Sequence, residues 1–285
     1  MSPRLLFLAL LLLAATGAAA APQRIVSLNL CTDLMLLELV DPARIAALTY
    51  LVRDPQLSPR AGQARDLPVH HGRVEEILPL RPDLIVAGRF GSRQTVQLLE
   101  RLGHPVERFE PVTRLGEYAV QLRRLAALLG TTARAERRLR QLETALAALE
   151  PTPGTRYPGA VVYRANGFST GAGTLVDELL GRVGLINLTA ELGLDQNGQL
   201  SLEQLLLSDP ELLVMGEFDP AQPALAQQLL RHPALAALLA RPGPHGARHS
   251  VTIPARDWNC AGTHLVQPLA ALAAARRRLL EEDWR

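Results

Sequence analysis

One stretch of this sequence occurs twice. Residues 74–88 read VEEILPLRPDLIVAG and residues 202–216 read LEQLLLSDPELLVMG, and they align without a gap at a constant offset of 128 positions that matches Glu75 with Glu203. In each copy an acidic residue lies near the start of a short predicted helix, where the helix dipole favours negative charge. A proline then ends the helix, and an apolar run predicts a strand that is buried on both faces. Two copies so far apart predict two similar α/β lobes rather than a solenoid of short repeats.

The remainder of the chain alternates predicted strands with predicted helices. The further strands are expected at 24–28, 45–50, 106–109, 159–163 and 250–253, and the helices at 33–39, 94–102, 116–129, 133–150, 175–181, 224–230, 234–240 and 265–282. The segments 51–71, 164–173 and 255–264 are rich in glycine, proline or polar residues and are expected to be loops. Strands that alternate with helices indicate parallel sheets covered on both faces.

The sequence therefore predicts an α/β fold of two Rossmann-like lobes with parallel sheets. The helix at 133–150 follows another helix without an intervening strand, and at about 27 Å it is long enough to join the lobes. We expect an N-terminal lobe at 21–131, a connecting helix at 132–150 and a C-terminal lobe at 151–285.

The first 20 residues have the features of a signal peptide. Arg4 supplies a positive charge, Leu5–Leu13 form an apolar segment too short to span a bilayer, and Ala18–Ala20 offer a cleavage site for signal peptidase. No cysteine follows that site directly, so the sequence does not predict a lipoprotein. We expect a protein that is exported to the periplasm, a compartment in which disulfides form.

Several classes of function lack their sequence signatures. A formal net charge of +2 with dispersed arginines is not typical of nucleic-acid binding. The glycine-rich loop 167–174 has neither the lysine of a P-loop nor the spacing of a dinucleotide fingerprint. No G-x-S-x-G or H-E-x-x-H motif occurs, and no cysteine pair has zinc spacing. We expect no catalytic residues, no resident metal and no cofactor.

The two cysteines occupy equivalent places in the predicted lobes. Cys31 and Cys260 each lie in a turn that follows a strand and leads into a helix, at the carboxyl ends of the strands where open α/β sheets bind ligands. A disulfide between them requires Cα atoms within about 7 Å of each other. Free thiols and a ligand role toward a bound metal centre are the alternatives.

The order of these features resembles a known family. The features are the export signal, the opening RIVSLNLCTDLMLLEL, the 74–88 stretch, the long helix at 133–150 and the second copy at 202–216. Together they resemble the helical-backbone (class III) periplasmic binding proteins, which serve ABC importers of cobalamin and ferric siderophores. The resemblance implies a monomer that holds its ligand between two lobes, and it places Glu75 and Glu203 where the family docks onto arginines of a permease dimer.

The candidate ligand-binding residues each follow the carboxyl end of a predicted strand. They are Asn29, Cys31, Tyr50, Arg89 and Phe90 in the N-terminal lobe and Asn166, Phe168, Glu217, Trp258 and Asn259 in the C-terminal lobe. The Asp257-Trp258 pair resembles the cleft tryptophan loop of cobalamin binders, which implies that the indole ring stacks on a flat ligand; the alternative is a tryptophan that fills the core.

The cysteines do not match those of the cobalamin protein, so a ferric siderophore and haem remain candidate ligands beside cobalamin. A haem-binding or metal-ion-binding protein of the same fold is an alternative. An exported hydrolytic enzyme on a two-lobed α/β scaffold is the alternative from another class, because fold alone does not define function.

Overall fold

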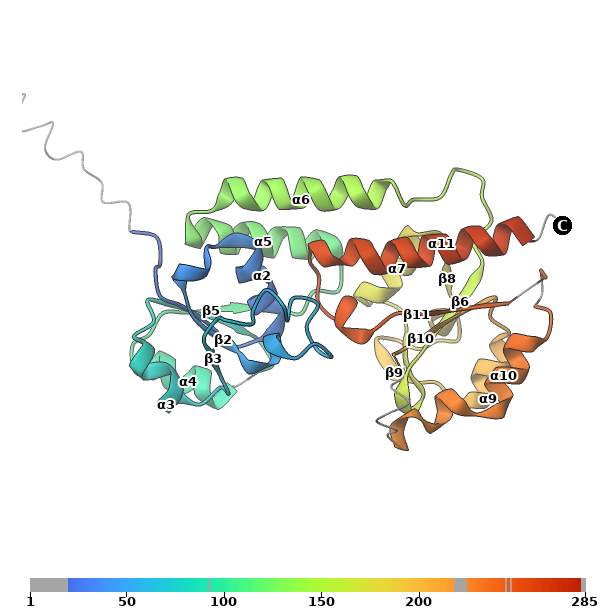
Figure 1. Cartoon of the computed structure of the whole chain (residues 1–285), viewed down its shortest axis with the longest axis horizontal. Coiled ribbons are helices and arrows are strands. Elements are labelled where there is room, and N and C mark those ends of the chain that lie inside the picture. The colour runs from blue at the N-terminus through green and yellow to red at the C-terminus, as the bar shows by residue number, and fades with distance from the viewer. Residues whose placement is uncertain (1–19, 92, 218–224, 244, 247, 283–285) are drawn as a thin grey trace, which may run out of the picture.

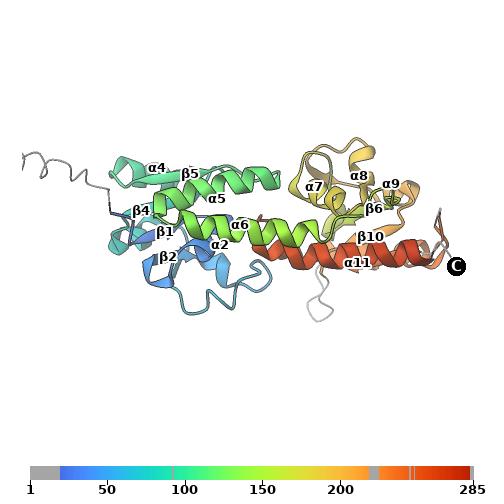
Figure 2. The same cartoon turned by 90° about the horizontal axis from the view of Figure 1, so that it is seen from above.

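The computed structural model describes residues 20–282 apart from 92, 218–224, 244 and 247. The predicted signal peptide therefore lies almost entirely outside the described residues, as does the first residue of the predicted helix 224–230. Two lobes lie side by side, with helices α6 (Thr132–Ala147) and α11 (Val266–Glu282) along the same side of the molecule (Figures 1 and 2). In the described part of the chain, no helix is long and apolar enough to cross a membrane.

The N-terminal lobe contains a parallel five-stranded sheet in the order β3-β2-β1-β4-β5. Its strands are β1 (Ile25–Ser27), β2 (Ile45–Thr49), β3 (Val69–His70), β4 (Leu84–Gly88) and β5 (Val106–Phe109), and its helices are α2 (Leu30–Leu39), α3 (Val74–Ile77), α4 (Arg93–Arg101) and α5 (Leu115–Leu129).

The C-terminal lobe contains a parallel four-stranded sheet in the order β11-β10-β6-β8. Its strands are β6 (Gly159–Tyr163), β8 (Ile186–Asn187), β10 (Leu212–Met215) and β11 (His249–Thr252), and its helices are α7 (Leu175–Arg182), α8 (Leu188–Glu191), α9 (Leu202–Ser208) and α10 (Pro233–Ala240). A separate antiparallel pair is formed by β7 (Phe168–Thr170) and β9 (Asn197–Gln199).

The sequence repeat occupies equivalent positions in the two sheets. Leu84 of β4 pairs with Ile25 of the first strand, and Leu212 of β10 pairs in the same way with Ala160 of β6. The residues before the two prolines, Arg81 and Asp209, both adopt a left-handed conformation with φ of 47° and 49°, and a following proline disfavours the right-handed helical alternative. The prediction of two α/β lobes with parallel sheets is confirmed.

One apolar core runs through both lobes. It contains Ile25 of β1, Leu142 of α6, Leu179 of α7 and Leu272 of α11. The connecting helix α6 contacts α2 and α5 of the N-terminal lobe and α11 of the C-terminal lobe, so it packs against both lobes. Helix α6 also ends at Ala147, a few residues before the predicted end. We keep 21–131 and 151–285 as the proposed extents of the lobes.

The predicted loops contain short elements that the sequence did not reveal. Segment 51–71 includes strand β3, and segment 164–173 includes strand β7. Strands of two or three residues are too short to show a period-2 pattern. Helix α2 begins at Leu30, earlier than predicted, because the Asn29 side chain accepts a hydrogen bond from the Cys31 N–H and caps the helix there.

Candidate ligand-binding site between the lobes

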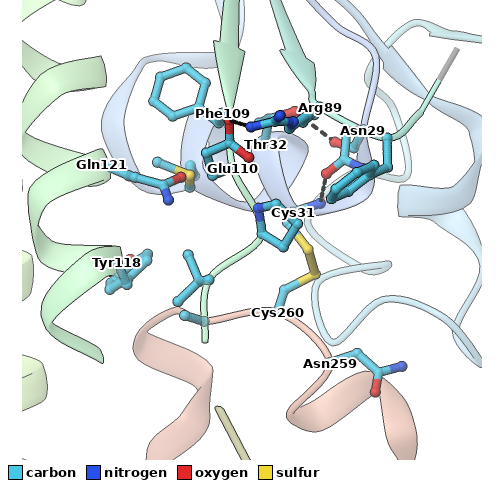
Figure 3. Close-up of a pocket in the computed structure, with 16 residues that line it drawn as sticks. Asn29, Cys31, Thr32, Arg89, Phe109, Glu110, Tyr118, Gln121, Asn259 and Cys260 are labelled. Atoms are coloured by element: carbon cyan, nitrogen blue, oxygen red, sulfur yellow. Dashed lines mark hydrogen bonds and ion pairs between the residues drawn. A yellow bond between two sulfur atoms is a disulfide. The ribbon is translucent and has the colours of Figure 1, made fainter. Parts of the chain in front are cut away.

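A first pocket of about 210 Å³ lies at the carboxyl ends of β1, β4 and β5 (Figure 3). It is lined by Asn29, Cys31, Thr32, Met35, Gly88, Arg89, Phe90, Phe109, Glu110, Pro111, Val112, Tyr118, Gln121, Asn259, Cys260 and Ala261. Because the last three follow β11 of the other lobe, both lobes build this pocket.

Charged and aromatic side chains lie along one wall of the first pocket. Arg89 donates to Glu110 at 2.7 Å, and its guanidinium carbon lies 5.9 Å from the centroid of the Phe90 ring. That ring is 64% exposed, so it offers an apolar face. Gly88 lies next to Asn29, the residue that caps α2, and an added Cβ at Gly88 would come within 2.9 Å of Asn29 Cγ.

A disulfide joins the two lobes beside this pocket. Cys31 lies in the first turn of α2 and Cys260 follows β11, and their Cα atoms are 5.3 Å apart (Figure 3). Of the three roles considered for these cysteines, the structure has the disulfide, so neither sulfur is free as a thiol or as a metal ligand.

A buried carboxylate holds the same two segments together. Glu38 of α2, with a side chain that is 1% exposed, pairs with Arg60 at 2.9 Å and accepts hydrogen bonds from the Tyr118 hydroxyl and from the N–H and hydroxyl of Thr263, each at 2.9 Å. The neighbouring His264 hydrogen-bonds through Nε2 to the Cys260 carbonyl at 3.0 Å. Burial lowers the pKa of His264 to about 4, so this ring is neutral at neutral pH.

A second pocket of about 470 Å³ lies mainly on the C-terminal lobe. It is lined by Pro111, Val112, Thr113, Arg164, Phe168, Ser169, Thr170, Thr174, Leu175, Val176, Gln196, Asn197, Trp258 and Asn259. Pro111, Val112 and Asn259 line both pockets. The two pockets therefore share a wall at the junction of the lobes.

Seven of the ten candidate ligand-binding residues line these pockets. Asn29, Cys31, Arg89, Phe90 and Asn259 line the first, and Phe168, Trp258 and Asn259 line the second. Three line neither pocket: Tyr50 stacks on His71 at a centroid distance of 4.9 Å, Asn166 forms a left-handed turn with φ of 57°, and Glu217 pairs with Arg256.

Trp258 fills the core in this structure. Its side chain is 1% exposed and belongs to the apolar cluster that runs through both lobes, so neither face of the ring is open to a stacking ligand. The core-filling alternative describes its environment better than the stacking arrangement that the family resemblance implied.

Sequence reasoning missed Arg164, which lines the second pocket. Arg164 follows β6 as Asn29 follows β1, because Ala160 and Ile25 occupy the same register against the repeated strand. Gly216 faces Arg164 at 3.5 Å from an added Cβ, as Gly88 faces Asn29. The sequence repeat makes Arg164 and Asn29 equivalent positions. It could therefore have identified Arg164 as a candidate ligand-binding residue.

The two repeat glutamates are exposed at corresponding helix starts. Glu75 lies in the first turn of α3 and Glu203 in the first turn of α9, and both helices lie on the side of the molecule opposite α6 and α11 (Figure 1). Hydrogen bonds from its own backbone N–H and from Ser201 lower the pKa of Glu203, so this side chain is an anion at neutral pH. Among the described residues, no group of three or more His, Cys, Asp or Glu side chains is placed to hold a metal ion.

Comparisons with known proteins identify the family to which this chain belongs. Residues 25–241 match the family model described as periplasmic binding protein, and the chain belongs to that family. No curated protein matched the sequence.

Three solved structures illustrate the similarity. A periplasmic haem-binding protein RhuT from Roseiflexus sp. RS-1 is 22% identical over 90% of this chain and 98% of its own, with a TM-score of 0.70. A periplasmic haem-binding protein from Pseudomonas aeruginosa is 26% identical over 89% and 92%, with a TM-score of 0.65. The periplasmic vitamin B12 binding protein BtuF of Vibrio cholerae is 17% identical over 91% and 98%, with a TM-score of 0.66. The family and these relatives are binding proteins, and membership implies a small-molecule ligand and an ABC permease as partner.

Proposed function

We propose that this protein captures a metal chelate between its lobes in the periplasm and delivers it to the permease of an ABC importer. The candidate chelates are a corrinoid such as cobalamin, a ferric siderophore and haem. The observation that carries the proposal is the pocket that both lobes build beside the disulfide, with the exposed Phe90 ring on one side and Asn259 on the other. Two of the similar solved proteins are haem-binding proteins and one is a vitamin B12 binding protein, which supports a flat metal chelate as the ligand.

The ligand test is direct. The protein is purified from the periplasm of cells supplied with corrinoids, haem and ferric siderophores, and the visible spectrum and mass of the bound compound are recorded. We expect one coloured chelate to co-purify in an equimolar amount. A colourless protein that also fails to bind each purified chelate in titration would contradict the proposal.

We further propose that Glu75 and Glu203 dock onto arginine clusters of the permease dimer while the protein acts as a monomer. The two carboxylates lie in the first turns of α3 and α9, and these two helices lie on one side of the molecule (Figure 1). A two-fold symmetric permease can present one cationic cluster to each. Arginine–carboxylate contacts that lose solvent in an interface are stronger than exposed ion pairs and orient the partners.

The docking test separates ligand binding from delivery. The double variant Glu75→Ala/Glu203→Ala should keep the affinity of the isolated protein for its ligand but lose stimulation of ATP hydrolysis by the reconstituted transporter, with each single variant intermediate. Glu143→Ala is the matched control, since its exposed carboxylate lies on α6, away from α3 and α9. Normal transport by the double variant would remove the docking proposal, and lost ligand affinity would assign these carboxylates to the ligand site instead.

A further inference from the structure

The backbone of Arg164 fixes this residue at the second pocket. Its N–H donates to the Phe168 carbonyl at 2.8 Å, and its carbonyl accepts from the Gly167 N–H at 3.0 Å. These bonds close the turn between β6 and β7, in which Asn166 and Gly167 both have a positive φ, of 57° and 70°. The guanidinium therefore extends from a tightly held turn, so its placement in the pocket costs the chain little additional conformational entropy.

Among the described residues, the guanidinium of Arg164 has only neutral partners. Nη2 donates to the Thr170 hydroxyl at 2.6 Å, Nη1 donates to the Asn259 side-chain oxygen at 3.5 Å, and Nε is buried without a hydrogen-bond partner. Within the described part of the chain, no carboxylate pairs with this group. Burial lowers the pKa of Arg164, yet an arginine side chain stays protonated in a protein.

Other arginines of the two lobes have counter-ions. Arg89 pairs with Glu110 at 2.7 Å, Arg156 pairs with Glu211 at 2.6 Å, and Arg256 pairs with Glu217. A half-buried cation without an anion carries a desolvation cost that its neutral partners do not fully offset. An anionic group from outside the chain would offset that cost at Arg164 alone among these arginines.

We propose that Arg164 determines ligand specificity by binding an acidic oxygen pair of the chelate, so that the ligand is an anionic chelate that carries carboxylates or catecholates. This inference rests on the proposed function and deepens it. The planar guanidinium has two N–H groups suited to a pair of acidic oxygens. Phe168, which is 48% exposed in the same pocket, provides an apolar surface beside that charge. A chelate with a flat apolar body and an acidic arm matches both features, whereas one with only amide side chains leaves Arg164 without a counter-ion.

Titration with matched probes tests the proposal. Ferric protoporphyrin is compared with the derivative in which both propionates are uncharged hydroxyethyl amides. A ferric tricatecholate is compared with a neutral ferric trihydroxamate and with dicyanocobinamide. The proteins are the wild type, Arg164→Gln, Arg164→Lys and the control Arg182→Gln, an arginine of the same lobe that lines neither ligand pocket and pairs with Glu143 and Glu150. Thermal melting verifies that each variant is folded.

We expect the wild type to bind an anionic probe at least about 10-fold more tightly than its neutral counterpart. Arg164→Gln should weaken binding of that anionic probe by about 10- to 100-fold and remove the preference, because a hydrogen-bonded charge pair is worth that much. The affinity of Arg164→Lys for the anionic probe should lie between those of the wild type and Arg164→Gln, since lysine keeps the charge but lacks the paired N–H donors of the guanidinium. Arg182→Gln should bind like the wild type.

The outcomes distinguish this inference from the function on which it rests. If the wild type binds neutral probes as tightly as anionic ones, or if Arg164→Gln leaves anionic binding unchanged, the inference is wrong and the proposed function stands. If none of these chelates binds the wild type, the proposed function fails and the inference fails with it.

Discussion

The Glu38 carboxylate lies where three segments of the chain meet. It accepts from Tyr118 of α5, from Arg60 and from Thr263 of the C-terminal lobe, and these donors lose their partner when the carboxylate is removed. Such a residue is costly to delete because a buried ion pair that loses one member leaves an uncompensated charge.

Glu38→Ala should therefore destabilise the protein by about 3–5 kcal/mol, measured by chemical denaturation of the oxidised protein. Glu143→Ala is the control, since its side chain is 65% exposed beside Arg182, and it should change stability by no more than about 0.5 kcal/mol. Equal effects of the two substitutions would show that the carboxylate cluster contributes little.

The lowered pKa of His264 makes the free energy of unfolding depend on pH. Burial lowers its pKa from 6.5 to about 4, so between these values the unfolded chain binds the proton and the folded chain does not. The contribution of His264 is complete above pH 6.5 and is lost as the pH falls toward 4, on the order of 3 kcal/mol in total.

A second buried group has the opposite dependence. Burial raises the pKa of Asp33 from 3.8 to about 7, so the contribution of Asp33 to stability is lost as the pH rises through this range.

Comparison of the wild type with His264→Gln separates the contribution of the histidine from that of Asp33. The variant should lose less stability than the wild type between pH 6.5 and 4.5 in denaturation experiments. Parallel curves for the two proteins would contradict the assignment.

At the scale of elements, the two copies of the repeat offer a matched experiment. An added Cβ at Gly88 would come within 2.9 Å of the Asn29 side chain that caps α2, whereas an added Cβ at Gly216 would stand 3.5 Å from Arg164. Gly88→Ala should cost about 1–3 kcal/mol through overpacking, and Gly216→Ala should be near neutral, as thermal melting can measure. A larger loss from Gly216→Ala would reverse the ranking.

The repeat also shows what the sequence could and could not predict. A continuous apolar run such as Leu84–Gly88 identifies a buried strand by itself, and the copy at an offset of 128 positions indicates a second lobe. The pairing of Cys31 with Cys260 depends on a distance across the lobes, so the sequence left it open. Trp258 is buried within an apolar cluster to which both lobes contribute, and no local pattern encodes that environment.

At the scale of the whole molecule, the disulfide fixes the lobes to each other. It links positions 229 residues apart, and a crosslink over a long loop removes much of the entropy of the unfolded chain. Cys31→Ala/Cys260→Ala should therefore reduce stability by about 2–5 kcal/mol and weaken ligand binding, because the segment with Asn259 is no longer tied to α2.

Thiol titration provides the supporting measurement. The native, oxidised protein should show no reactive thiol, and two thiols should appear after reduction and unfolding. Two thiols in the native protein, or a double variant as stable as the wild type, would contradict this role for the bond.

The separation of the two cysteines also has a consequence for how the protein matures. Cys31 emerges early from the ribosome, but its partner, 229 residues further along the chain, emerges much later. The bond needs an oxidising compartment, so the disulfide beside the pocket should not form in the cytoplasm. A copy retained there should remain reduced, so its two lobes should lack the covalent link beside the pocket.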